Sequence, residues 1–328
     1  MELIGGQYIK IMAYVNNIKR GWDRLNPDSL GTISYDFATR TMSISPKTGQ
    51  DEFYFWSNDR LFSKTSTQSV VFPDVSGTYY FYFDTDGILQ YILDDDWTHD
   101  LFVKIAITGL VYYDAVAKSG WYASDEQHGV LMNSACHYRL HTVDNYKWSR
   151  IGGNIIGLTD ASDTYTKIEW GIWEDEDISI TIAETTEHPF IYRSGTNGEW
   201  KMTAADNKVG YVNSGDTYVC YNKYSGGTWQ LIESNSSTDY IIYFFIATNF
   251  ATHPIRKIIG QTTYSSRNAA RKGLLNELKA IQTDGLPSAE MEFIYAYICK
   301  RNGDLEDDGY GNAYVDLRGV NINSLLDS

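Results

Sequence analysis

Residues 78–92 have the sequence TYYFYFDTDGILQYI, in which two aromatic-rich stretches flank the turn Asp84-Thr85-Asp86-Gly87. Aromatic and β-branched side chains favour strands. Asp-Gly between two such strands supplies the positive φ that a tight hairpin turn needs. This segment therefore predicts an antiparallel β-hairpin.

The same pattern recurs on both sides of this hairpin. Further short strands are predicted at 41–45, 53–56, 69–72, 101–107, 110–113, 167–170, 178–182, 190–193, 218–221, 228–232 and 240–248. Several short strands separated by Gly, Asn, Asp and Ser are typical of sandwiches and barrels. We therefore predict a mainly β fold class, with two antiparallel β-sandwich or barrel-like domains.

One stretch, residues 266–281, departs from the β pattern. Its apolar side chains recur with the period of a helix, and Ser266 stands at the N-cap position. The apolar stripe consists of Ala270, Leu274, Leu278 and Ile281. The sequence thus predicts one amphipathic helix near the C-terminus, ended by the turn at 284–287.

The predicted organisation has four parts. They are an N-terminal attachment arm at 1–40, a first β domain at 41–123, a connector at 124–163, and a second β domain at 164–328 that includes the helix and a C-terminal hairpin. In that hairpin, residues 292–299 fit a helix or a strand. Their alternating aromatics, with 312–317 as a pairing partner, favour a strand.

Composition excludes several function classes. The 328 residues carry a net charge of −15, which argues against nucleic-acid binding and against anionic membrane surfaces. The longest apolar run, 240–248, is far below the roughly 20 residues of a membrane helix, so no membrane insertion is expected. Three widely spaced cysteines, Cys136, Cys220 and Cys299, indicate no disulfide framework.

Two stretches partly fit metal sites. His137 and His141 stand four residues apart beside Cys136, but no third ligand follows at a familiar distance, so structural histidines are favoured. Residues 304–312 resemble a calcium loop, but Val315 replaces its bidentate Glu, so a polar hairpin turn is favoured. We therefore predict no metal and no cofactor, and folding that needs neither ion nor disulfide.

Two acidic runs lie beside tryptophans: residues 174–177 follow Trp170 and Trp173, and residues 94–96 precede Trp97. A glycosidase needs two carboxylates at a set separation next to a sugar-stacking platform. Consecutive acids at a strand end are more typical of a solvated turn. Since the sequence also has no nucleophile elbow, Walker loop, HExxH or GxGxxG motif, no catalytic residue is assigned and the chain is predicted not to be an enzyme.

The predicted hairpin tip at 224–229 carries the best candidate contact residues, Tyr224 and Trp229. Exposed aromatic rings stack on sugars, so these two side chains are candidates for contact with a glycan or a protein partner. The alternative, which we favour, is that they pack across the strands as a stabilising pair.

Several stretches resemble structural proteins of tailed-phage virions, in particular tail-fibre and receptor-binding proteins. The similar segments are 111–114 with 122–129 (YASDEQHG), 137–142, 190–195 with 199–201, 246–249, 259–261, 264–266 and 311–319. The chain departs from a typical fibre because it has no long heptad stretch and no shaft repeat, which predicts a compact protein.

The resemblance implies a non-enzymatic virion protein made in the host bacterial cytoplasm: a tail fibre, a tail or collar protein, or a head decoration. A contribution to host attachment is part of the implied role. The implied partners are further copies of the chain, with a trimer favoured, other virion proteins and a host-surface glycan. An alternative from another class is a carbohydrate-binding module or glycan-processing protein of a bacterium.

Overall fold

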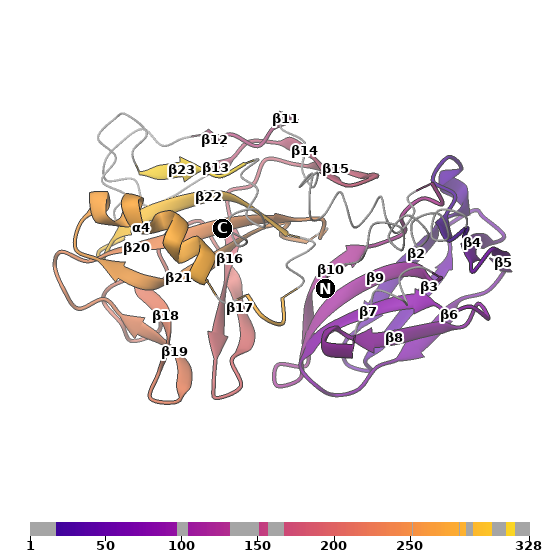
Figure 1. Cartoon of the computed structure of the whole chain (residues 1–328), viewed down its shortest axis with the longest axis horizontal. Helices are drawn as coiled ribbons and strands as arrows, with labels where there is room; N and C mark the ends of the chain where they lie inside the picture. The colour runs from indigo at the N-terminus through magenta and orange to yellow at the C-terminus, as the bar shows by residue number, and fades with distance from the viewer. Residues whose placement is uncertain are drawn as a thin grey trace, which may run out of the picture. The chain divides into compact units, whose positions relative to one another are not determined.

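The computed structural model describes residues 18–96, 104–131, 151–156, 167–250, 252–281, 283–286, 291–303 and 313–318. Their regular structure is nearly all β-strand, with helix α4 (Arg267–Ala280) near the C-terminus (Figure 1), so the predicted mainly β fold class is confirmed. The chain divides into two compact units. The first is Met1–Asp144 with Glu176–Ile178, and the second is Asn145–Asp175 with Ser179–Ser328.

The described strands of the first unit form three antiparallel sheets. The first sheet has the order β1 (Gly21–Trp22), β4 (Phe53–Ser57), β5 (Arg60–Lys64). The second has the order β2 (Gly31–Asp36), β3 (Thr41–Pro46), β6 (Gln68–Val71). The third has the order β10 (Ser119–Asp125), β9 (Ala106–Asp114), β7 (Gly77–Phe83), β8 (Leu89–Leu93). Two 3-10 turns, η1 (Pro27–Ser29) and η2 (Asp94–Asp96), accompany them. The hairpin predicted at 78–92 is the β7–β8 pair.

This β7–β8 hairpin shows how the sequence positions the core. Asp84 closes the turn, because its Oδ1 accepts hydrogen bonds from two backbone N–H groups at 2.9 Å, and Gly87 takes a φ of +73°. Alternate side chains of β7 point into the core and are fully buried: Tyr79, Phe81 and Phe83. They share one apolar cluster with side chains of β3 and β4, so the sheets face each other across it.

The described part of the predicted N-terminal arm, residues 18–40, is integral to the first unit rather than an arm. Trp22 is fully buried, and its indole N–H donates to the carbonyl of Ile107 at 2.7 Å. β2 pairs with β3 along its whole length. The predicted connector at 124–163 also divides, with 124–131 in the first unit and 151–156 in the second.

The second unit centres on a six-stranded sheet. Its order is β17 (Glu199–Asp206), β16 (His188–Ser194), β21 (Ile255–Tyr264), β20 (Tyr240–Thr248), β22 (Met291–Lys300) and β23 (Tyr314–Asp316). β16 and β21 run parallel, which departs from the purely antiparallel prediction, while the other neighbours are antiparallel. The β22–β23 pair confirms that residues 292–299 form a strand.

Smaller sheets complete the described part of this unit. They are β18 (Cys220–Ser225) with β19 (Thr228–Glu233), β12 (Ile155–Ile156) with β13 (Lys167–Ile168), and β11 (Ile151–Gly152), β14 (Gly171–Asp175), β15 (Ile178–Ile182). Ile178, the first residue of β15, belongs to the first unit by its contacts.

Helix α4 lies against one face of the six-stranded sheet, beside β20, β21 and β22 (Figure 1). The hydroxyl of Ser266 caps its N-terminus by accepting the Ala269 N–H at 3.1 Å, as the sequence predicted. The whole predicted stripe is buried: Ala270, Leu274, Leu278 and Ile281. The helix therefore shields apolar surface of the sheet from water.

Candidate functional site

Two hairpin tips meet in the second unit, those of β16–β17 and β18–β19. Gly195 in the first turn and Trp229 in β19 exchange two backbone hydrogen bonds of 3.0 Å. Gly195, Gly226 and Gly227 all have positive φ, and a Cβ at any of them would project into open space. Glycine adopts this conformation without strain. The tips are therefore open backbone turns.

Tyr224 and Trp229 occupy facing positions of the β18–β19 pair. Their ring centroids lie 5.8 Å apart and their planes are tilted by 57°. Trp229 is only 7% exposed, whereas Tyr224 is 52% exposed. The cross-strand contact thus exists, and Trp229 is largely occupied by packing within the chain. Contact with a glycan or partner stays a prediction, and Tyr224 is the side chain with a ring face available for it.

Arg193 holds the base of these tips together. Its guanidinium lies 4.7 Å from the ring centroid of Trp229 and 5.9 Å from that of Trp200, and its Nε donates to the Gly198 carbonyl at 3.0 Å. A cation over an indole face is attracted by the negative charge of the π system. The Trp200 N–H donates to the Asp284 carbonyl at 2.9 Å. Packing thereby sets the relative position of the two hairpins.

A different polar arrangement lies within the first unit, in the loop that follows β10. Gln127 anchors this loop, because its side-chain amide accepts the Gly31 N–H at 2.8 Å and donates to the Gly31 carbonyl at 3.1 Å. The loop backbone also pairs with β1. The Trp22 N–H donates to the His128 carbonyl at 2.9 Å, and the Val130 N–H donates to the Trp22 carbonyl at 2.8 Å.

We call Ser124, Glu126, His128, Glu176 and Asp177 the His128 cluster, and all five belong to the first unit. His128 Nδ1 lies 2.6 Å from Asp177 Oδ1. His128 Nε2 lies 3.3 Å from Glu126 Oε2 and 3.7 Å from Glu176 Oε2. The Ser124 hydroxyl donates to Glu126 Oε1. The imidazole is thus surrounded by three carboxylates.

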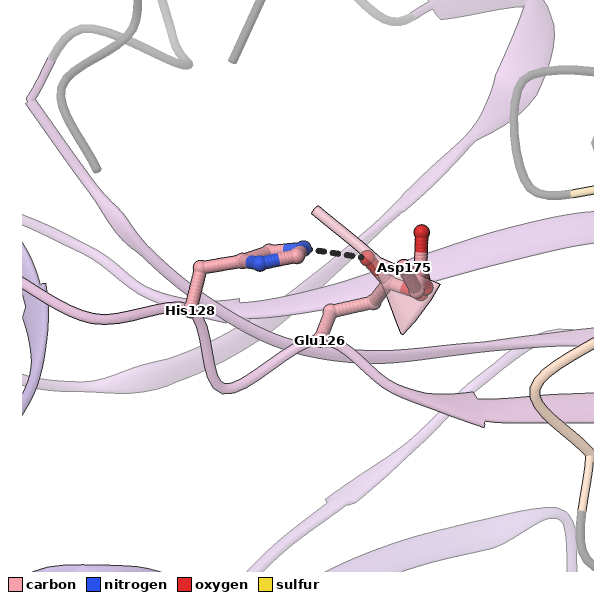
Figure 2. A group of neighbouring side chains, drawn as sticks. All are labelled: Glu126, His128 and Asp175. Carbon is pink, nitrogen blue, oxygen red and sulfur yellow. Dashed lines mark hydrogen bonds and ion pairs between the residues drawn. The ribbon is translucent and has the colours of Figure 1, made fainter. Parts of the chain in front are cut away.

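Figure 2 shows how Glu126 and His128 project from the same loop, with a dashed line for the ion pair between them. These two residues are separated by one position in sequence, and alternate residues of an extended chain share a face. Asp175, also drawn, belongs to the second unit, where Asn249 Nδ2 donates to its Oδ2 at 2.5 Å.

The carboxylates control the charge state of the imidazole. Burial by itself lowers the pKa of His128, but the bond to Asp177 and the charges of Glu126 and Glu176 outweigh burial, so this pKa lies well above 6.5. Burial raises the pKa of Asp177, but the hydrogen bond and charge of His128, the Gly129 N–H and the charge of Arg24 together outweigh burial, so the net shift of this pKa is downward. Burial lowers the pKa of Arg20 to about 10, although the negative charge of Asp177 by itself would raise this pKa.

This geometry does not form a hydrolytic triad. In a triad, a serine hydroxyl bonds to one imidazole nitrogen and a carboxylate bonds to the other. Asp177 satisfies the second condition, but the Ser124 hydroxyl is directed to Glu126 and the second nitrogen of His128 faces carboxylates. His128 is also only 4% exposed. The cluster therefore suits a structural role better than acyl transfer.

The acidic run at 174–177 is not the solvated turn that its sequence favoured. Asp175 and Glu176 are buried, and Glu176 takes a φ of +48° in the turn between β14 and β15. The physical reason is that this turn directs carboxylates toward His128 instead of toward water. Of the two tryptophans before this run, Trp173 is buried and offers no platform for a sugar, whereas Trp170 is 48% exposed.

Two other sequence candidates, the Cys136–His141 segment and the loop at 304–312, lie outside the described residues. Among the residues that the structure describes, no helix is both long enough and apolar enough to cross a membrane. Comparisons with protein-family models, curated proteins and solved structures found no match.

Proposed function

We propose that this chain is a non-enzymatic structural protein of a tailed-phage virion: a tail-fibre, tail, collar or head-decoration component. The observation that supports this most is that residues carrying the resemblance hold β-structure together. Gln127 and His128 anchor the loop after β10, and Arg193 and Trp200 join the hairpin tips. Such use of polar and aromatic side chains suits a protein that works by assembly and contact.

Within this function, we assign partner or host-surface contact to the hairpin tips of the second unit. Tyr224 is half exposed beside the open turn at Gly226 and Gly227. Tyrosine is enriched in the cores of protein interfaces, and its ring face also stacks on the C–H face of a sugar. The neighbouring backbone is held by Trp229, so the contact surface is preorganised, which lowers the entropic cost of binding.

The proposal includes self-association into a closed symmetric assembly, the usual form of soluble oligomers, and the resemblance to tail-fibre proteins favours a trimer. Mass spectrometry of virions purified from the encoding phage is the direct test. Peptides of this chain should sediment with the particles, and light scattering of the purified chain should give three times its mass of 37.3 kDa. A strict monomer that fails to co-purify with particles would contradict the proposal.

A second candidate function, a bacterial carbohydrate-binding module, is favoured by the exposed ring of Tyr224. A glycan array with the parent chain and Tyr224→Ala tests it. Tyr91→Ala is a matched control, because Tyr91 is 36% exposed and also packs on a neighbouring aromatic ring, but in the first unit. Loss of a glycan signal in Tyr224→Ala alone would assign sugar binding to the tip. Glycan hydrolysis abolished by Glu174→Gln would contradict a non-enzymatic protein.

A further inference from the structure

The parallel pairing of β16 with β21 is short, and it joins the β16–β17 hairpin to the rest of the six-stranded sheet. Its register has two pairs, Phe190 with Lys257 and Ile191 with Ile258. The β16–β17 ladder also shifts its register after Pro189, and proline has no N–H to donate to a ladder. The start of β16 therefore depends on side chains for its attachment to the sheet.

Two basic side chains are fully buried where this hairpin joins the sheet, His188 at the start of β16 and Lys257 in β21. Lys257 lies between Phe190 and Phe245 in the register, and its Nζ lies 3.7 Å from the ring centroid of Phe190. The His188 ring packs edge-on against Phe245, with centroids 5.5 Å apart. Nζ donates at 2.9 Å to the carbonyl of Asp206, the residue that pairs with His188. The two bases therefore share one aromatic region.

The surroundings of His188 suit a neutral ring and oppose a charged one. Its Nε2 lies 2.9 Å from the Thr185 hydroxyl oxygen, and its Nδ1 has no hydrogen-bond partner in the described part of the chain. An imidazolium donates from both nitrogens. A second proton would therefore leave a buried N–H without an acceptor. The charges that act on the ring are those of Lys257 and of His253, in the turn before β21, and both oppose protonation.

The closed hairpin therefore binds fewer protons than an open one. Burial lowers the pKa of His188 to about 3, and burial lowers the pKa of Lys257 to about 7, although the charge of Asp206 by itself would raise the latter. Contact with water returns these pKa values toward 6.5 and 10.5. The open form then carries the extra proton of His188 below 6.5 and that of Lys257 between 7 and 10.5. Both differences make acid favour opening.

We propose that His188 and Lys257 form an acid-sensitive switch, which releases the base of the β16–β17 hairpin from β21 as the pH falls. Opening lets His188 take a proton from solvent and frees two backbone carbonyls from Nζ of Lys257. The tip of the hairpin stays attached, because the bonds between Gly195 and Trp229 join backbone groups that do not titrate. The switch therefore loosens one edge of the sheet without unfolding the second unit. This inference goes beyond the proposed virion function and does not depend on it.

Hydrogen–deuterium exchange of the full chain, followed by mass spectrometry, tests the switch without any variant. Peptides from β16–β17 and from β22 are compared at pH 7.5 and 5.5, each corrected for the intrinsic exchange rate. The opening equilibrium constant of β16–β17 should rise roughly tenfold from His188 alone, and further from Lys257, whereas β22 should stay protected. Equal changes in both sets would mean unfolding of the whole unit, and no change in β16–β17 would mean that His188 does not titrate. Either result would overturn the proposal.

Variants assign the effect to the two bases. His188→Gln should remove the tenfold rise, because the amide keeps a hydrogen-bonding group for Thr185 and gains no charge in acid. Lys257→Met should remove the remaining part, because it keeps an unbranched apolar stem beside Phe190. His253→Gln is the matched control, since His253 is an exposed histidine of the same unit, and it should leave the rise nearly unchanged. A full rise that persists in His188→Gln would overturn the assignment. The measurement on the parent chain stands even where a variant does not fold.

Discussion

Among single residues, Glu277 is a buried carboxylate on the sheet-facing side of α4. Its Oε1 accepts the N–H groups of Gln261 at 2.7 Å and Thr262 at 3.1 Å, and its Oε2 accepts the Tyr264 hydroxyl at 2.9 Å. Burial raises its pKa to about 7, although these hydrogen bonds lower it in part. Near neutral pH the folded chain therefore keeps a proton that the unfolded chain releases.

The pH dependence of stability follows from this shift. The contribution of Glu277 is fully present below its unfolded pKa of 4.5 and is lost as the pH rises through about 7. That difference corresponds to roughly 3 kcal/mol. Glu277→Gln keeps an acceptor for the two backbone N–H groups and removes the charge. We expect this variant to unfold at higher urea than the parent at about pH 8 and to show a flatter pH profile. Equal profiles would mean that Glu277 titrates normally.

At this scale the sequence predicts contacts within one hairpin better than contacts between distant segments. The pairing of Tyr224 with Trp229 follows from the short Gly-rich turn between them, and the structure has it. The burial of Trp229 also depends on Arg193 and Gly195 of another hairpin, which no local pattern indicates. The contact between His128 and Asp177 also joins distant segments, and no local sequence pattern indicates it.

Among the elements, helix α4 allows a direct test of its buried stripe. Leu278 is 2% exposed, so Leu278→Ala should lower the free energy of unfolding by roughly 2–5 kcal/mol. Leu278→Asp should lower it further, because a charge without a partner would be buried. Leu275→Ala is the matched control on the same helix, since Leu275 is 46% exposed, and it should cost less than about 1 kcal/mol. Urea unfolding measures all three.

A different outcome would change the role of this helix. If Leu278→Ala is as stable as the parent chain but fails to assemble, the stripe is an interface between subunits. If neither stability nor assembly changes, the helix contributes little to the second unit. That outcome would contradict the role inferred from the burial of its apolar stripe.

The β7–β8 turn gives a prediction about the first unit. Gly87 has a φ of +73°, and a Cβ there would lie 2.4 Å from Cδ1 of Phe62. Gly87→Ala should therefore cost the roughly 1–2 kcal/mol of a left-handed residue plus a steric term. Gly226→Ala isolates the backbone effect, because its φ is +64° and its surroundings are open. Thermal unfolding should show the larger loss for Gly87→Ala. Equal losses would mean that Phe62 moves aside freely.

Strands were predictable from the sequence where buried and less buried side chains alternate, as in β3 and β4, or where apolar and aromatic residues run together, as in β20. β21 was not, because its buried part includes two basic side chains, Arg256 and Lys257, one on each face of the strand. Lys257 lies 3.7 Å from the ring centroid of Phe190, and its Nζ donates to two backbone carbonyls at 2.6 and 2.9 Å. Such pairing lets a charged side chain occupy a core strand, where a hydropathy pattern predicts a loop.

For the whole molecule, two separate cores were predictable from composition and spacing, but their boundaries were not. The first core includes Trp22, from the stretch predicted to be an arm. Residues 176–178 belong to the first unit although they follow part of the second unit in sequence. Both boundary predictions were wrong for the same reason. A side chain or turn can pack into a distant core without any change in the periodicity of the apolar residues around it.

Net charge gives the prediction for the assembled protein. Each chain carries −15 at pH 7, so the subunits of the proposed trimer repel one another. Salt shortens the range of this repulsion from about 30 Å at 0.01 M to about 10 Å at 0.1 M. The trimeric fraction should therefore rise over this range of NaCl. Light scattering at a fixed chain concentration measures it, with helix and strand content followed by circular dichroism as a control for unfolding. A trimeric fraction that falls with salt would show that complementary charged patches, and not apolar contacts working against repulsion, hold the subunits together.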